Sequence, residues 1–367
     1  NFAAKAGMSS ALFRFTGACL GHHRGGVAMA AVGACAGFGA ICGSSLATAA
    51  TMGKVALPEL RKMGYSGSLS TGALAAGGTL GILIPPSVIL IIYSILTEQN
   101  IAKMFLAAFI PGILAAIGYI IAIAVFVRIF PDSGPRNMLV DWKTRVILFK
   151  DIWQVVLIFL LVIGGIYLGW FTPTEGAAIG AAGTGIMAAF SKGFSFIDLI
   201  EVIQETAVTA AMIFVILLGA EFFNSFIALT RITNLLAESV IEYNFSPFTI
   251  VAIILVIYVL LGCLMDSLAM ILLTIPVFFP IIVQLDFGMS VEETAIWFGI
   301  LTLIVVEVGL ITPPVGLNVF IINKIAKDVP ISDTFRGVLP FLLSDFLRVV
   351  LLFLFPSITL VLVRALY

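Results

Sequence analysis

Two apolar segments of the chain contain the residues that a membrane helix tolerates least. The stretch GTLGILIPPS (78–87) and its near-copy VGLITPPVG (308–316) each combine glycines with two adjacent prolines. Proline lacks a backbone N–H and prevents the residue before it from remaining helical. A broken helix exposes carbonyl oxygens at one half-helix end and N–H groups at the other, and these groups can bind a cation or an anion. Each segment therefore predicts a discontinuous helix that lines a binding site.

The composition places these segments in a membrane protein. Of the 367 residues, 61% are hydrophobic and 11% are charged, whereas a soluble domain carries about 25% charged residues. Many apolar stretches exceed the length of a soluble core helix, about 10–14 residues. The net charge of −1 argues against a nucleic-acid partner. We therefore expect an all-α integral membrane protein whose outer surface contacts the lipid bilayer.

Two further apolar stretches have polar centres. They cover about 27–53 and 248–283, with CGSSLAT (42–48) and GCLMDSLAM (262–270) at their centres. Non-helical backbone at membrane depth survives only where protein or a water-filled cavity surrounds it. We therefore interpret both as re-entrant helical hairpins whose polar tips line a site. Asp266 is ionisable and lies at such a tip, so we interpret it as a ligand for a cation or a proton, with a structural, hydrogen-bonded carboxylate as the alternative.

These features recur in the same order in both halves of the chain. SLAT (45–48) aligns with SLAM (267–270), and the two proline breaks align as GILIPP (81–86) with GLITPP (309–314). The sequence thus predicts an internal repeat. The first copy is expected at 1–127, with a broken helix at about 68–96. The second is expected at 152–367, with a broken helix at about 295–322. A basic, amphipathic arm, 128–151, connects them.

The basic residues give an independent indication of orientation. If both arms of each hairpin return to one membrane face, most of the 19 lysines and arginines share a side. The positive-inside rule places that side in the cytoplasm and the C-terminus in the periplasm. The two copies then have opposite orientations, which is the inverted-repeat plan of secondary transporters. The residues on the basic side are Arg24, Lys54, Arg61, Lys62, Arg128, Arg136, Lys143, Arg145, Lys150, Lys192, Lys324, Lys327 and Arg336.

The tips and breaks, together with GHHRGGVA (21–28) and TPTEGAAIGA (172–181), resemble the large membrane subunit of the tripartite ATP-independent periplasmic (TRAP) transporters, the M or DctM-like subunit. The resemblance covers essentially the whole chain. It implies a fold of the elevator type and sodium-coupled import of a small organic anion across the bacterial inner membrane, for example sialic acid, a C4-dicarboxylate or a sulfonate. It also implies no cofactor besides Na⁺ as coupling ion, and two partners: a small four-helix Q or DctQ-like membrane subunit and a periplasmic substrate-binding protein.

The first repeat is expected to be N-terminally incomplete. TPTEG lies about 90 residues before the tip of the second repeat, whereas only 44 residues precede Ser45.

With sodium implied as the coupling ion, each tip pairs with its break to give a predicted sodium site. The first combines Ser44 and Ser45 with Thr79 and Gly81, and the second combines Asp266 and Ser267 with Gly309 and Thr312. The alternative is that these hydroxyls satisfy only local backbone groups. The anion is expected between the tips, where backbone N–H groups and three side chains could contact it: Thr48, Ser87 and Asn318.

Other functions remain as alternatives. A proton-coupled transporter of the same fold would use Asp266 as the carrier. An anion channel is less favoured, because a channel needs no pair of inverted, broken-helix sites. An intramembrane protease would need an aspartate pair, a Ser–His dyad or a metal site, and the sequence contains no such pattern, so we expect no enzyme. Glu175 begins a predicted helix and is interpreted as a cap, whereas Glu221 and Glu307 receive no role.

Overall fold

The computed structural model describes residues 1–191, 193–232 and 245–367, and every regular element in these ranges is helical. Among the described residues, three helices are long and apolar enough to cross a membrane, or up to five if each of two bent pairs counts as one span. The three are α7 (Ile101–Ile129), α11 (Phe196–Thr230) and α17 (Ile331–Leu354). The predicted all-α membrane fold is therefore confirmed at this level.

Each stretch with a polar centre forms two helices joined by a short link. Helices α3 (Gly26–Cys42) and α4 (Ser45–Lys62) make the first pair, and α13 (Pro247–Gly262) and α14 (Ser267–Ile282) make the second. In both, the last residue of the link caps the second helix. Ser44 Oγ accepts from the Ala47 N–H at 3.4 Å, and an Asp266 carboxylate oxygen accepts from the Leu268 N–H at 3.0 Å. Side-chain caps of this kind explain why α4 and α14 begin at the tips.

The proline-containing stretches interrupt two helices. Helix α5 (Gly67–Leu83) is followed after residues 84–87 by α6 (Val88–Leu96), at a bend of 44°. Helix α15 (Val291–Gly309) is followed after residues 310–316 by α16 (Leu317–Ile325). The Pro85–Pro86 and Pro313–Pro314 bonds are both cis. Neither helix can carry its backbone hydrogen bonds through two residues that lack an N–H, which is why α5 and α15 end where they do.

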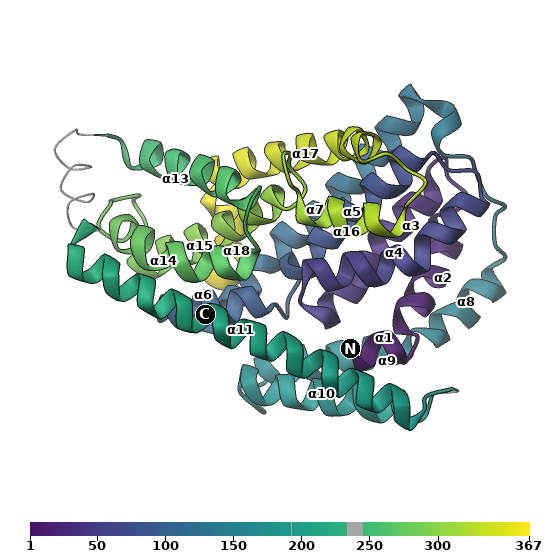
Figure 1. Ribbon diagram of the computed structural model, residues 1–367, viewed down its shortest axis with the longest axis horizontal. Helices are drawn as coiled ribbons and strands as arrows, with labels where there is room; N and C mark the ends of the chain where they lie inside the picture. Colours follow the sequence, from purple (N-terminus) through teal and green to yellow (C-terminus); the bar gives the residue numbers. More distant parts are fainter. Residues whose placement is uncertain (192, 233–244) are drawn as a thin grey trace.

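The two halves interlock through these elements. Helix α4 packs against α5 of its own half and against α16 of the other half, and α14 packs against α15 and α6 in the same crossed manner. Figure 1 shows the α3–α4 pair at one end of the long axis and the α13–α14 pair at the other, with the broken helices between them. The ends of the broken helices therefore bring the two hairpin tips toward each other.

Glycines allow the closest approaches in this core. Gly39 on α3 lies against the backbone of Gly81 on α5, and Gly262 on α13 lies against the backbone of Gly309 on α15. A Cβ atom at Gly39 or Gly309 would overlap its partner's backbone. The same glycine-to-glycine contact thus joins the first hairpin helix to the broken helix in both halves, as expected for membrane helices that pack through small residues.

The remaining helices surround this core. Helices α7 and α17 pack against each other and against α5 and α15, and α18 (Pro356–Leu366) packs against α7. Helices α9 (Trp153–Tyr167) and α10 (Pro173–Ala189) pack together, and Figure 1 places them with α11 along one side of the molecule. Helix α2 (Met8–Leu20) packs against α3.

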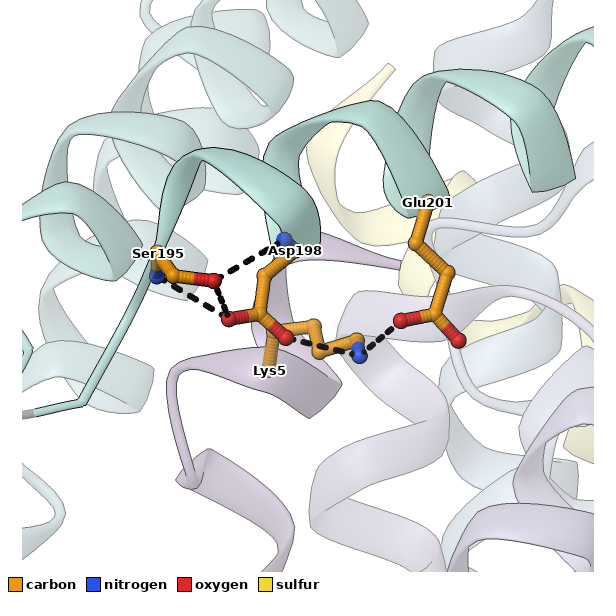
Figure 2. A network of polar contacts seen from close by, with 4 residues as sticks. All are labelled: Lys5, Ser195, Asp198 and Glu201. Carbon is orange, nitrogen blue, oxygen red and sulfur yellow. Dashed lines mark hydrogen bonds and ion pairs between the residues drawn. The ribbon is translucent and has the colours of Figure 1, made fainter.

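A polar network fastens the N-terminal helix α1 (Phe2–Lys5) to α11 (Figure 2). Lys5 Nζ donates to Asp198 Oδ1 at 3.0 Å and to Glu201 Oε2 at 2.6 Å. Asp198 also accepts from the Ser195 Oγ at 2.7 Å, within the capping box that begins α11. Because α1 packs against α10 as well, it belongs structurally to the α9–α11 side.

The predicted arm between the repeats contains one short helix. After the 3₁₀ turn η1 (Pro131–Ser133) and a non-helical stretch, α8 (Trp142–Asp151) packs against α2 and meets α9 at a bend of 52°. Trp142 and Trp153 are both exposed. Of the basic residues used to infer orientation, Lys192 lies outside the described residues.

Candidate functional site

A buried carboxylate connects the two hairpin tips. Glu307, near the end of α15, is 1% exposed. Its Oε1 accepts from Ser267 Oγ at 2.9 Å, and its Oε2 accepts from Ser45 Oγ. Ser45 and Ser267 are the first residues of α4 and α14, and they correspond in the sequence repeat. A single side chain therefore accepts a hydrogen bond from the equivalent serine of each half of the molecule.

The first predicted cation cluster is partly assembled. The space beside the Gly81 Cα is occupied by the Ser44 carbonyl oxygen and by Thr48 Oγ1, so the first break lies directly against the first tip. Residue 85, four positions after Gly81, is a proline, and the Gly81 carbonyl therefore lacks its normal helical donor. The structure thus brings Ser44, Ser45 and Gly81 into one neighbourhood that is rich in oxygen atoms.

The Thr79 hydroxyl, in contrast, lies away from this tip. It donates to the Ala76 carbonyl at 2.7 Å and lies 3.0 Å from the hydroxyl of Tyr119 on α7. Tyr119 in turn donates to Asp345 on α17, which forms a buried ion pair with Arg348 at 2.7 Å. The side chain that we expected at the first cation site therefore belongs to a polar network between α5, α7 and α17.

The second predicted cluster has a different local structure. Pro313 stands four positions after Gly309, but the Gly309 carbonyl has a replacement donor, the Thr312 N–H at 3.1 Å. The Asn318 N–H likewise donates to the Leu310 carbonyl at 3.0 Å across the break. Thr312 Oγ1 donates to the Val308 carbonyl at 2.6 Å. Asp266 and Ser267 lie at the tip, and Gly309 is two residues from Glu307 on the same broken helix.

A cavity of about 370 Å³ lies between the first tip, the first break and the helices α9–α11. Its volume is within the range of small-molecule pockets, roughly 300–1,000 Å³. Ser87 lines the cavity, but the other two expected anion contacts, Thr48 and Asn318, do not. Other lining residues come from the tip and from α10 and α11, and include Cys42, Gly43, Gly176, Ala177, Thr184 and Thr206.

Thr48 and Asn318 are instead fully buried behind the first tip. Asn318 Nδ2 donates to the Ala75 carbonyl at 3.2 Å and lies close to Gly78, where the Ser45 carbonyl is also near. Within the described part of the chain, Asn318 Oδ1 and Thr48 Oγ1 have no hydrogen-bond partner other than the weakly bonding thiol of Cys42 beside Thr48. Buried oxygen atoms rarely lack a donor, so both acceptors are available to a ligand.

Sequence reasoning assigned no role to Glu307 and left Asp345 and Arg348 out. The signal that could have identified them is an ionisable side chain inside an apolar helix, which in membrane proteins is a functional hypothesis by default. Glu175, interpreted from the sequence as a cap, accepts from the Thr172 N–H at 2.7 Å and closes the capping box of α10. Glu221 is exposed on α11.

Known proteins resemble this chain over nearly its whole length. The family model of the tripartite ATP-independent periplasmic transporter, DctM component, matches residues 1–358. The C4-dicarboxylate TRAP transporter large permease protein DctM of Pseudomonas aeruginosa is 33% identical over 98% of this chain and 83% of its own length. The sialic acid TRAP transporter permease protein SiaT of Haemophilus influenzae is 32% identical over 96% of this chain and 56% of its own length.

A third relative, the isethionate TRAP transporter permease protein DctMQ of Oleidesulfovibrio alaskensis, is 29% identical over 92% of this chain and 52% of its own length. These relatives are permease components of transporters and not enzymes.

Proposed function

Because the chain belongs to the DctM-component family of tripartite ATP-independent periplasmic transporters, we propose that it is the large membrane subunit of a sodium-coupled importer of a small organic anion in the bacterial inner membrane. The observation that carries this proposal is the convergence of both hairpin tips on Glu307, each tip beside a proline-broken helix. Secondary transporters place their substrate and ion sites at such breaks.

Sodium binds at the two tip-and-break clusters in this proposal. Hydroxyl and carbonyl oxygens suit a hard cation, and unwound backbone carbonyls coordinate Na⁺ in other transporters with broken helices. The first site uses Ser44, Ser45 and Gly81, with the carbonyl of Thr79, and the unpartnered oxygens of Thr48 and Asn318 support it. The second site uses the Asp266 carboxylate and Ser267 together with Gly309 and Thr312.

The anion occupies the cavity beside the first tip. Ser87 and Val88, at the start of α6, line this cavity, and an anion is stabilised at a helix N-terminus. The relatives are named for C4-dicarboxylates, sialic acid and isethionate. We therefore propose a substrate class, small organic anions, and not one compound.

Transport proceeds by an elevator movement in this proposal. The hairpins and broken helices, which interlock, move as one body against α9–α11, and the cavity between the two groups opens to alternate sides. The repeats extend over 1–127 and 152–367 in opposite orientations, with the first hairpin re-entering from the cytoplasmic face and the second from the periplasmic face. The arm 128–151 lies at the cytoplasmic interface, and the C-terminus is periplasmic.

The family's tripartite organisation supplies the proposed partners. A periplasmic binding protein delivers the anion, and a small four-helix membrane subunit accompanies this chain.

Uptake into proteoliposomes tests the proposal. The complete transporter would be supplied with its binding protein and with labelled C4-dicarboxylate, sialic acid and isethionate, under an imposed sodium gradient or an imposed pH gradient. We expect accumulation of one anion that requires inward-directed sodium. Accumulation that needs only a pH gradient would establish the proton-coupled alternative, and single-channel currents without accumulation would establish a channel.

A further inference from the structure

Among the described residues, Glu307 is the side chain that accepts hydrogen bonds from both hairpin tips, through Ser45 and Ser267, and neither proposed sodium site includes it. We propose that Glu307 is a positioning residue shared by the two cation sites, which orients Ser45 and Ser267 as ligands and couples the filling of one site to the other. The inference rests on the proposed binding of sodium at the tips.

The direction of the two serine protons determines what each hydroxyl can still bind. A serine hydroxyl has one proton to donate and two lone pairs with which to accept. Both Ser45 and Ser267 donate that proton to the Glu307 carboxylate. Their lone pairs therefore remain free to bind a cation. Without the carboxylate, each hydroxyl could rotate and donate elsewhere, so Glu307 fixes both as acceptors.

The buried charge of Glu307 also favours cation binding at the tips. Glu307 is 1% exposed, and no lysine, arginine or histidine in the described ranges forms an ion pair with it. The charged groups that act on it are two further carboxylates, Asp266 and Asp345, and Asp345 is already paired with Arg348. A buried carboxylate without a cation is strongly unfavourable. Glu307 and Asp266 together carry two negative charges, so a cation at one tip leaves negative charge to stabilise a cation at the other.

The two halves of the repeat differ at the position of Glu307. The residue that corresponds to Glu307 in the first half is Thr79, and its hydroxyl faces Tyr119 and not a tip. One carboxylate from the second half therefore serves both halves. A cation that orders Ser45 also fixes the carboxylate, and this reduces the cost of ordering Ser267. Such sharing is a coupling free energy between two sites, and it predicts cooperative sodium binding.

A sodium titration of thermal unfolding tests this inference. The purified complex of this chain with its small membrane subunit would be heated at increasing sodium, with potassium keeping the ionic strength constant. For the unchanged protein we expect a sigmoidal rise of the unfolding temperature. Glu307→Gln should raise the half-saturating sodium concentration by about tenfold or more, the typical effect of losing a residue that orients metal ligands. The curve should also lose its sigmoidal shape.

Two further variants make the result specific. Glu307→Asp keeps the charge but is one methylene shorter, so it should reach only one serine and should lose cooperativity while sodium still stabilises the protein. Thr302→Val is the matched control, because Thr302 lies on the same helix, is fully buried, and has a hydroxyl without a partner among the described residues. Its titration should equal that of the unchanged protein.

The outcomes separate the inference from the proposed function. Sodium curves for Glu307→Gln and Glu307→Asp that match the Thr302→Val curve would overturn the role of Glu307 and leave sodium coupling intact. If Glu307→Gln does not fold, a sigmoidal, unshifted curve for Glu307→Asp would overturn it equally. An unchanged protein that responds identically to sodium and potassium would contradict sodium binding itself, and the inference with it.

Discussion

Asp266 and Ser44 occupy equivalent positions in the two halves and do the same structural work. Each caps the second helix of its hairpin by accepting from a backbone N–H. Only Asp266 adds a formal charge at its tip. The capping function and the proposed ligand function are therefore combined in one carboxylate, and a suitable substitution can separate them.

We predict that Asp266→Asn abolishes sodium-dependent stabilisation of the second site but leaves folding nearly unchanged, because asparagine caps helices about as well as aspartate does. Asp266→Ala should lose the cap as well, at a cost of about 1 kcal/mol in the free energy of unfolding. Thermal unfolding with and without sodium distinguishes the two variants. Normal sodium-dependent uptake by Asp266→Asn would contradict a carboxylate ligand at this tip.

The sequence could identify Asp266 but not the partners of Glu307. Asp266 is recognisable because it begins a helix after a polar link in an apolar segment. Glu307 bonds to residues 262 and 40 positions away in the chain, and the repeat aligns it with Thr79, which suggests no carboxylate function. Only the packing of α15 between the two tips defines its contacts. The same packing turns the Thr79 hydroxyl toward Tyr119, which local sequence does not encode.

At the scale of helices, the packing of the broken helices depends on glycine. Gly309 lies directly against the backbone of Gly262, whereas Gly164 on α9 has open space where a Cβ would lie. The positions of these elements were predictable from glycine, proline and polar residues in apolar stretches, because those residues interrupt helices for local reasons. The packing of α6 against α14, and of α16 against α4, was not predictable, because it depends on long-range contacts between the halves.

We predict opposite effects of alanine at these two glycines. Gly309→Ala should destabilise the protein by about 1–3 kcal/mol, since the added methyl overpacks a close helix contact. Gly164→Ala should stabilise it by about 0.5–1 kcal/mol, because alanine loses less backbone entropy in a helix. Thermal unfolding of both variants in the same detergent provides the measurement. Equal effects would mean that the contact of α13 with α15 is not close in the folded protein.

The buried network between α5, α7 and α17 forms a second connection between the halves. Tyr119 links Thr79 to Asp345, and Asp345 pairs with Arg348. Removing one member of a buried ion pair leaves the other charge without compensation. Arg348 already has two nitrogen atoms without partners among the described residues.

We predict that Asp345→Leu destabilises the protein by about 3–5 kcal/mol, the usual cost of leaving a buried charge unpaired. The double variant Asp345→Leu, Arg348→Met should recover most of that loss, because no charge then remains. A double-mutant cycle of thermal unfolding measures the difference. If the double variant lost as much stability as the two single variants together, the two side chains would not interact.

At the scale of the whole molecule, the chain divides into an interlocked core and a flanking group. Each hairpin packs against part of the broken helix of its own half and part of that of the other half. The two hairpins and the two broken helices therefore cannot move independently. Helices α9–α11 pack beside the core, and Lys5 fastens α1 to α11 on that side (Figure 2). The cavity beside the first tip lies between the two groups. An elevator movement would carry the core, the tips and the bound ions together past α9–α11.

The joint flux of sodium and anion tests sodium coupling at two linked sites most directly. Radioactive sodium and the labelled anion would be counted as they enter proteoliposomes that contain the complete transporter and its binding protein. We expect sodium to enter only together with the anion, with at least two sodium ions for each anion. Anion entry without accompanying sodium would contradict sodium coupling.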